Sequence, residues 1–360
     1  MPEIISVSKL DMPYRIPQKV MRDFAVSTFS GNFPDTERLL PVFENSDINE
    51  RNLCVPLEYF NQKKSFAQRN NDYLKLAVDM ASEVILKCIS DSGFDKNDIT
   101  DFIYISSTGI STPSPDAYII NRLKLNNNIN RYPLWGLGCA GGAAGTAKAG
   151  TIAKADPDSL VLVVTCELCS LTFLSGDYTK SNFVATSLFS DGVAAVLVKG
   201  DGLDSDRVSD KRILIKDSAS NIYYDSIDVM GWDVTDEGLK VIFSKDIPSI
   251  VENNLKPEID KFLLKSNLAA SDIKNYITHP GGVKVIDSYI RCLELEECSL
   301  NITRETLRNY GNMSSATVLY VLDNFVRKGL REGPGLMTSL GPGFSSEMVL
   351  LDIEKSDQDG

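Results

Sequence analysis

The 360-residue sequence contains a single histidine, His279, so catalysis by imidazole has one candidate residue in each chain. Basic residues are also scarce, because 37 Lys and Arg stand against 49 Asp and Glu, which gives a formal net charge of −12. A nucleic-acid-binding protein is therefore not expected, since neutralising phosphates takes a basic surface. The seven cysteines are an odd number in a long chain and argue against a disulfide framework.

Long hydrophobic runs are missing as well. The longest, residues 160–166, is too short to span a bilayer. The first 14 residues include Glu3 and lack the apolar core of a signal peptide. We therefore expect a cytoplasmic protein in a reducing compartment, without a membrane anchor.

Alternating strand and helix patterns predict an α/β fold. Apolar residues recur every three or four positions in residues 65–92, which predicts an amphipathic helix. Continuous apolar runs at residues 102–107, 160–165 and 194–198 predict buried strands. Such runs, separated by helices, indicate a sheet that is covered on both faces.

The second half of the chain repeats this organisation. Its predicted strands and helices lie at residues 213–218, 247–264, 276–278, 283–293, 314–327 and 335–353. Both halves finish on a glycine-containing turn that leads into a strand, which indicates an internal duplication. The polar stretch 200–211 is the candidate junction, so we divide the chain into residues 1–204 and 205–360.

Cys139 is the candidate nucleophile. It lies in Gly138-Cys139-Ala-Gly-Gly, directly before a run of small residues that is typical of a closely packed helix. A cysteine at a helix N-terminus meets the positive end of the helix dipole, which lowers the thiol pKa and favours the nucleophilic thiolate. The alternative is a buried structural cysteine at a glycine- and alanine-rich joint.

His279 and Asn312 also precede predicted helices. His279 ends a short strand and is followed by Pro-Gly-Gly, at the kind of turn where ligands meet open α/β sheets. Asn312, taken alone, is better explained as a helix cap. Together with Cys139 the two suit acyl transfer, because the thiolate would carry an acyl group while His and Asn donate hydrogen bonds to an oxyanion or enolate.

Five motifs in order give the sequence its resemblance to the type III polyketide synthases, the chalcone-synthase-like branch of the thiolase superfamily. They are Gly138-Cys-Ala-Gly-Gly, Met230-Gly-Trp-Asp-Val, His279-Pro-Gly-Gly, Gly311-Asn-Met-Ser-Ser-Ala-Thr and Gly341-Pro-Gly-Phe. The resemblance covers residues 55–351. It implies a homodimer with the duplicated, five-layered αβαβα thiolase fold, and it matches Cys139, His279 and Asn312 to the family's nucleophile, histidine and asparagine.

The reaction that the resemblance implies uses acyl-CoA and malonyl-CoA and needs no metal or redox cofactor. Cys139 takes the acyl group of a starter, and decarboxylation of malonyl-CoA leaves an enolate that His279 and Asn312 stabilise. The enolate then lengthens the acyl chain by two carbons. Cys166 and Cys169 are spaced C-x-x-C but have no second pair at ligand spacing, so we expect no metal site.

The resemblance also assigns residues to the substrate cavity. Phe189 matches the first of two gatekeeper phenylalanines, whereas Val241 falls at the second and widens the neck. Trp232 stands where plant members have a glycine. This pattern resembles bacterial alkylpyrone and alkylresorcinol synthases, which take long fatty acyl starters. The remaining cavity assignments are Cys169, Thr172, Ser314, Gly343, Phe344 and, near the point where one subunit reaches into its partner's cavity, Thr112.

Three cations are candidates for binding the CoA phosphates. Lys284 follows the histidine motif and matches a family position at the CoA tunnel. Arg38 and Arg51 fall in the N-terminal region where the family keeps basic residues, although Pro41 fills a position that is usually basic. The alternative for both arginines is an ordinary solvated surface charge.

Two other functions remain as alternatives. An initiating ketoacyl synthase of fatty-acid synthesis also uses Cys, His and Asn, but it takes an acyl carrier protein and carries a His-Gln-Ala-Asn motif, against which His279-Pro-Gly-Gly argues. A catalytically inactive thiolase-fold partner subunit is the second, and retention of all three residues argues against it. Starter length, number of extensions and ring closure are left open.

Overall fold

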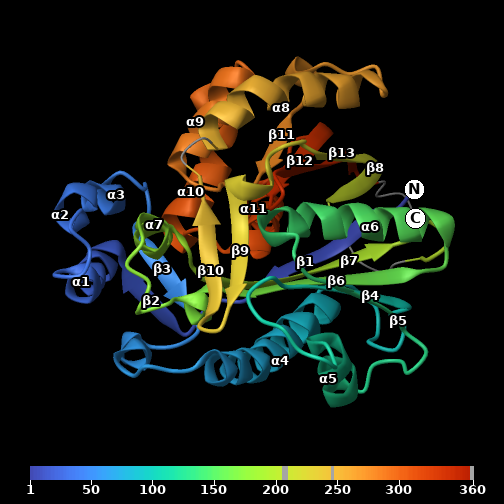
Figure 1. Cartoon of the computed structure of the whole chain (residues 1–360). Coiled ribbons are helices and arrows are strands. Elements are labelled where there is room, and N and C mark those ends of the chain that lie inside the picture. Colours follow the sequence, from blue (N-terminus) through green and yellow to red (C-terminus); the bar gives the residue numbers. More distant parts are fainter. Residues whose placement is uncertain (205–209, 245–246, 357–360) are drawn as a thin grey trace.

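The computed structural model describes residues 1–204, 210–244 and 247–356 (Figure 1). Its main sheet combines strands from both halves. The N-terminal half contributes β1 (Glu3–Lys9), β4 (Asp101–Ile105), β5 (Asn130–Leu134), β6 (Leu160–Leu168) and β7 (Asp191–Lys199). The C-terminal half contributes β8 (Lys211–Ile222), β11 (Asn275–Thr278), β12 (Gly333–Gly341) and β13 (Ser345–Lys355).

The two sets of strands meet at a narrow seam. Within the described residues the hydrogen-bonded order is β11-β12-β13-β8-β1-β7-β6-β4-β5. However, β1 pairs with β8 only at Glu3–Leu214 and Ile4–Ile213. Each half therefore builds its own sheet, and the two sheets touch along one short edge.

Helices form three layers around these sheets (Figure 1). The outer face of the N-terminal strands is covered by α4 (Phe66–Ser90) and α5 (Pro115–Leu123). The outer face of the C-terminal strands is covered by α8 (Ile247–Leu264), α9 (Val283–Cys292) and α10 (Asn301–Tyr310). Between the sheets lie α6 (Gly141–Ala155) and α11 (Thr317–Lys328). This arrangement confirms the predicted α/β class with five αβαβα layers.

The small residues of α6 explain why a helix fits between two sheets. Gly145 packs so closely on the N-terminal strands that an added Cβ would lie 2.4 Å from Ile105 Cδ1 and 2.9 Å from Val163 Cγ1. Ala143, Ala147 and Ala153 of the same helix belong to the core that the two halves share. Helix α6 is therefore the common centre of both halves.

The strongly periodic segments have the predicted structure. The predicted helix at residues 65–92 is α4, and Ser65 caps it, because its Oγ accepts from Gln68 N at 3.2 Å while Gln68 Oε1 accepts from Ser65 N at 2.9 Å. The predicted strands and helices of the second half are also present. Of the predicted junction 200–211, residues 205–209 lie outside the described residues, so the boundary at residue 204 stays a prediction.

The N-terminal 60 residues hold helices that the sequence analysis missed. This region contains β2 (Tyr14–Pro17), α1 (Gln18–Phe29), α2 (Thr36–Leu39), α3 (Pro41–Glu44) and β3 (Glu50–Leu53). Helix α7 (Lys180–Leu188), from later in the chain, contacts α1 and α3. Met21, Ala25 and Phe29 of α1 are buried in a separate core with Phe43 and Phe183. Their four-residue spacing was the available signal.

A separate two-stranded sheet completes the fold. It consists of β9 (Met230–Thr235) and β10 (Gly238–Phe243), and it places Val241 directly opposite Trp232. Short 3-10 helices are η1 (Leu57–Asn61), η2 (Gly138–Ala140), η3 (Cys169–Thr172), η4 (Ile227–Val229), η5 (Ala270–Asp272), η6 (Glu297–Leu300) and η7 (Ser314–Ala316). None of the helices in the described ranges is long and apolar enough to cross a membrane.

The packing of α6 gives a test of this architecture. A Cβ at Gly142 would lie 2.4 Å from the backbone oxygen of Ser315 and 2.5 Å from Val318 Cγ1. We expect Gly142→Ala to lower the free energy of unfolding by about 1–3 kcal/mol, because the backbone atom cannot move aside. Gly176→Ala is the control, since a Cβ there meets nothing within 4 Å. Equal melting temperatures for the two variants would contradict the packing.

Candidate active site

Cys139 and Asn312 meet in the structure although 173 residues separate them. Cys139 lies in η2, the turn that leads into α6, and it is 8% exposed. Its thiol donates weakly to Asn312 Oδ1 at 3.9 Å and to Ser314 Oγ at 3.8 Å. Two of the three predicted catalytic residues therefore share one buried site, and the predicted cavity residue Ser314 joins them.

Asn312 joins three segments of the chain through its side chain and its backbone. Its Nδ2 donates to Gly281 O at 3.0 Å, in the turn after His279, and its Oδ1 accepts from Ser314 N at 2.9 Å. Its backbone N donates to Leu188 O at 2.9 Å and its carbonyl accepts from Ser190 N at 2.7 Å. Asn312 is therefore more than a helix cap, because it fixes the histidine turn and the Phe189 segment against the cysteine.

His279 follows β11 and is 4% exposed. Neither ring nitrogen has a hydrogen-bond partner among the residues that the structure describes. Buried polar atoms in folded proteins are nearly always paired. The unpaired imidazole therefore points to a partner that arrives with the substrate.

Burial opposes charge on both groups. It raises the pKa of the Cys139 thiol to about 12 and lowers the pKa of His279 to about 3. The expectation that the helix N-terminus lowers the Cys139 pKa is wrong for this state, because the loss of water on burial outweighs the hydrogen bonds between the sulfur and the Ser314 and Asn312 side chains. Cys139 is therefore a neutral thiol at neutral pH in this state.

Glu167 is a buried group that the sequence analysis missed. It ends the apolar run of β6 and accepts from Ser315 Oγ at 2.6 Å and from Ser107 N at 3.0 Å. Burial raises its pKa to about 7. It ties the η7 segment to β6, and a charge on it adds to the rise of the Cys139 pKa. A lone acidic residue inside a buried strand was the signal that could have revealed it.

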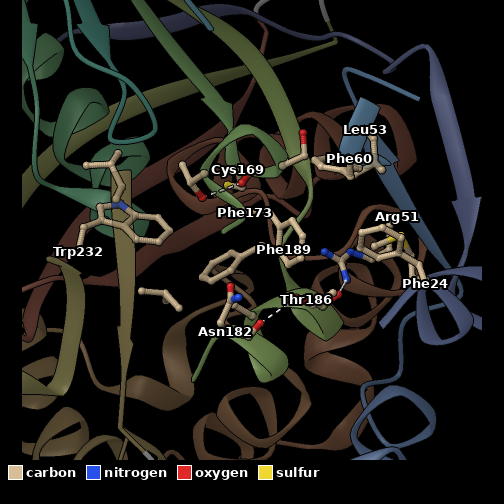
Figure 2. A pocket seen from close by; sticks show the side chains of 16 residues that line it. Phe24, Arg51, Leu53, Phe60, Cys169, Phe173, Asn182, Thr186, Phe189 and Trp232 are labelled. Carbon is tan, nitrogen blue, oxygen red and sulfur yellow. Dashed lines mark hydrogen bonds between the residues drawn. The ribbon is translucent and has the colours of Figure 1, made fainter. Parts of the chain in front are cut away.

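A cavity of about 50 Å³ lies beside Phe189, which pairs with Asn312, and it is lined by residues of both halves (Figure 2). Cys139, His279 and Asn312 do not line it. Five predicted cavity residues line it, namely Cys169, Thr172, Phe189, Trp232 and Val241. The rings of Phe189 and Trp232 are 6.2 Å apart. The two-stranded sheet thus forms one wall, with Trp232 and Val241 facing the gatekeeper segment.

The rest of the cavity wall is mostly apolar. It includes residues that the sequence analysis did not assign, among them Met21 and Phe24 of α1, Leu53, Phe60 and Phe173. They come from α1, from β3 and η1, and from the segment after η3. The cavity wall therefore contains more aromatic side chains than the family motifs alone implied.

Three cavity assignments fall elsewhere. Phe344 is buried in the core, where its ring lies 5.4 Å from that of Tyr223, and it does not line this cavity. Gly343 forms the preceding turn with a φ of +70° and does not line the cavity either. Thr112 is exposed on the loop before α5.

The three candidate CoA ligands differ in their surroundings. Lys284 is exposed in the first turn of α9. Arg38 is exposed and paired with Asp35 at 2.8 Å. Arg51 is 2% exposed, and its guanidinium donates to Ser190 Oγ and to Thr186 O. A phosphate-binding role for Arg51 is not supported, because its charge lies inside the protein.

Both halves of the chain match one family of proteins. Residues 55–202 match the N-terminal domain of the chalcone and stilbene synthases, and residues 215–353 match the C-terminal domain. The chain belongs to the chalcone and stilbene synthase family. The predicted resemblance is thereby confirmed, and this type III polyketide synthase is a condensing acyltransferase. The alternatives of an initiating ketoacyl synthase and of an inactive subunit are not supported.

Individual relatives agree with this family. The chain is 42% identical to a putative chalcone synthase of Bacillus subtilis over 98% of its own length and 99% of the relative's. It is 31% identical to a 1,3,6,8-tetrahydroxynaphthalene synthase of Streptomyces peucetius, covering 94% and 90%. Its fold matches the crystal structure of 1,3,6,8-tetrahydroxynaphthalene synthase of Streptomyces coelicolor, a bacterial type III polyketide synthase, with a TM-score of 0.92, 28% identity and coverage of 98% and 100%.

The opposed pKa shifts predict how Cys139 reacts with iodoacetamide. If His279 takes the thiol proton, its positive charge lowers the Cys139 pKa. In a variant without His279, only burial would then act on the Cys139 pKa. We expect His279→Gln to move the midpoint of the alkylation rate to higher pH by about one unit or more. The measurement is the alkylation of the Cys139 peptide against pH by mass spectrometry. An unchanged midpoint would rule out His279 as the base.

Proposed function

We propose that this type III polyketide synthase loads a long-chain fatty acyl-CoA on Cys139, extends it with malonyl-CoA, and cyclises the product to an alkylpyrone. An alkylresorcinol would follow from further extension. The observation that carries this proposal is the wall of the cavity, where Met21, Phe24 and Phe60 provide apolar surface and Val241 stands where a second gatekeeper ring is expected. An alkyl tail fits such a wall.

Loading is assigned to Cys139 and His279. Neutral His279 takes the thiol proton, and the sulfur attacks the thioester carbonyl of the acyl-CoA. The bond between that carbon and the CoA sulfur breaks, and the CoA sulfur takes the proton from His279. The acyl group stays on Cys139, CoA leaves as its thiol, and the imidazole is neutral again. Burial favours a neutral imidazole, which is the form that can accept a proton.

Extension is assigned to His279 and Asn312. Malonyl-CoA loses carbon dioxide, and the enolate oxygen accepts hydrogen bonds from the imidazole and from Asn312 Nδ2, which has a second N–H besides the one given to Gly281 O. The enolate carbon attacks the acyl carbonyl, and the carbon–sulfur bond to Cys139 breaks. The chain, now two carbons longer, leaves as its CoA thioester. We expect no metal or redox cofactor in these steps.

Substrate selection is assigned to the cavity. Each CH₂ that leaves water contributes about 0.8 kcal/mol, so affinity should rise with starter length until the cavity is filled. Trp232 occupies space that further malonyl units would need, which favours short extensions. Outside the cavity, Lys284 and Arg38 remain the proposed contacts of the CoA phosphates, since both are exposed.

We further propose that the protein works as a cytoplasmic homodimer. Strand β5 is the edge of the main sheet, and its residues Asn130 to Pro133 are exposed. Exposed sheet edges are usually covered, and a second copy is the partner that the family resemblance implies. Thr112 of one subunit would then reach the cavity of the other.

Tetrahydroxynaphthalene synthesis is the second candidate function. It is favoured by the names of relatives that are 31% and 28% identical to the chain. A product analysis with malonyl-CoA alone separates the two candidates, because a fatty acyl starter is then absent.

Replacing Asn312 tests its role in extension. We expect Asn312→Ala to lower the rate of malonyl-CoA decarboxylation by about 10²–10³, because one donor to the enolate is lost. Loading of Cys139 with an acyl group should stay largely intact, as measured by mass spectrometry of the intact protein. Asn301→Ala is the control, because this asparagine is exposed at the start of α10. Near-normal decarboxylation would reduce Asn312 to a structural residue.

Starter choice tests the cavity. With a ladder of acyl-CoAs and malonyl-CoA, we expect a higher kcat/KM for long fatty acyl starters than for acetyl-CoA or coumaroyl-CoA. Val241→Phe should shift the preference to shorter starters, because the added ring narrows the neck beside Phe189. Val234→Phe is the control on the same two-stranded sheet, where the side chain is 63% exposed. Preference for the aromatic starter, or an unchanged ladder in Val241→Phe, would contradict the proposal.

A further inference from the structure

A buried cation lines the mostly apolar cavity. Arg51, on β3, lines the cavity although it is 2% exposed. Figure 2 shows its guanidinium across the cavity from Trp232, with Phe189 between them. Keeping a charge out of water is costly unless a partner compensates it. The contacts of the Arg51 guanidinium determine how far this cost is compensated.

The hydrogen bonds of Arg51 leave one of its nitrogens without a partner. Nε donates to Ser190 Oγ at 2.9 Å, and Nη1 donates to Thr186 O at 2.8 Å. Within the described ranges, Nη2 has no hydrogen-bond acceptor and no carboxylate forms an ion pair with Arg51. Two of the three guanidinium nitrogens are thus held by the protein, and Nη2 is left for a group in the cavity.

The nearest acidic residue does not fill this position. Asp191 accepts from Cys54 N at 2.7 Å, from Ser170 N at 2.7 Å and from Ser170 Oγ at 2.6 Å. Its charge partly supports that of Arg51, but burial still lowers the pKa of Arg51 to about 9. The guanidinium therefore stays charged at neutral pH and lacks a bonded anion.

The chemistry of the reaction limits what the free nitrogen can bind. An alkyl tail offers no acceptor, and the proposed contacts of the CoA phosphates, Lys284 and Arg38, do not line this cavity. The extended chain, in contrast, carries carbonyl oxygens on alternate carbons, and the CH₂ between two of them is acidic, so an enolate forms readily. A guanidinium N–H donor suits such an oxygen, since charge-assisted hydrogen bonds are about twice as strong as neutral ones.

We propose that Nη2 of Arg51 binds a carbonyl or enolate oxygen of the poly-β-keto segment that grows on Cys139, and thereby sets how far the chain is extended before release. This role rests on the type III polyketide synthase reaction and not on the length of the starter. Arg51 is a specificity-determining residue in this scheme.

The position of Arg51 relative to the nucleophile supports this assignment. Cys169 lines the same cavity, and its thiol interacts electrostatically with both Cys139 and Arg51. Arg51 therefore shares the cavity with a residue that lies near the nucleophile. In the proposed scheme it binds a keto group from an earlier extension, while the thioester carbonyl is left to His279 and Asn312.

A purely structural role would have a different signature. Thr186 and Ser190 flank Phe189, so Arg51 also holds the gatekeeper segment in place. Ser190→Ala removes the partner of Nε and keeps the cation, whereas Arg51→Gln removes the cation and keeps an amide that can donate to Thr186 O. Comparing these two variants separates holding the segment from binding the chain.

The direct test uses a long-chain 2,4-dione as a probe, because it contains the β-keto unit and cannot be transferred to Cys139. We expect the dione bound to the unmodified protein to show the ultraviolet band of its enolate at a lower pH than the free dione, since a nearby cation stabilises the anion. This measurement needs no variant. An unshifted titration of the bound dione would overturn the proposal.

The variants extend this test. We expect Arg51→Gln to bind the dione without the enolate band and Ser190→Ala to keep the band. In turnover with malonyl-CoA, Arg51→Gln should release products after fewer extensions, and Ser190→Ala should keep the product pattern. The same band in Arg51→Gln as in the unmodified protein, or its loss in both variants, would overturn the role of Arg51. Rejection of fatty acyl starters would count against the proposed substrate alone, because the dione spectrum reports on Arg51 independently.

Discussion

The close approach of two helix starts is the constraint on which this structure depends. The backbone at Gly142 lies against the carbonyl of Ser315, with no space for a side chain between them. Cys139 precedes the first of these helices and Asn312 precedes the second, so their contact follows from the packing of α6 on α11. Because one helix belongs to each half of the chain, the site is complete only when both halves are folded together.

Burial and reactivity are balanced within this contact. The same packing that aligns Cys139 with Asn312 removes water, and it therefore favours the neutral thiol and the neutral imidazole. Asn312 has a different task, because its amide and backbone join the histidine turn, the Phe189 segment and Ser314. The packing thus fixes both the positions of these segments and the neutral resting state of the two groups.

The sequence predicted the features that local patterns determine. The helix at residues 65–92, the buried strands and the positions of Cys139, His279 and Asn312 before helices all depend on periodicity or on short motifs. The sequence failed where distant segments decide. Nothing local shows that Arg51 is buried under α7 or that Phe344 packs on Tyr223. The predicted lowering of the Cys139 pKa by the helix N-terminus failed for the same reason. Burial by residues far along the chain outweighs the local effect of the helix dipole.

The two-stranded sheet of β9 and β10 has a consequence for how such an enzyme changes over generations. In the described residues its strands hydrogen-bond as a pair of their own, and Arg69 of α4 donates to the Glu237 carbonyl at its tip. Trp232 and Val241 both belong to it. Substitutions there reshape the cavity without disturbing the central helices or the catalytic contact. Evolution can thus change the wall of the cavity by substitutions in this one hairpin. Selection for folding acts on a different part of the chain, where α6 packs on α11.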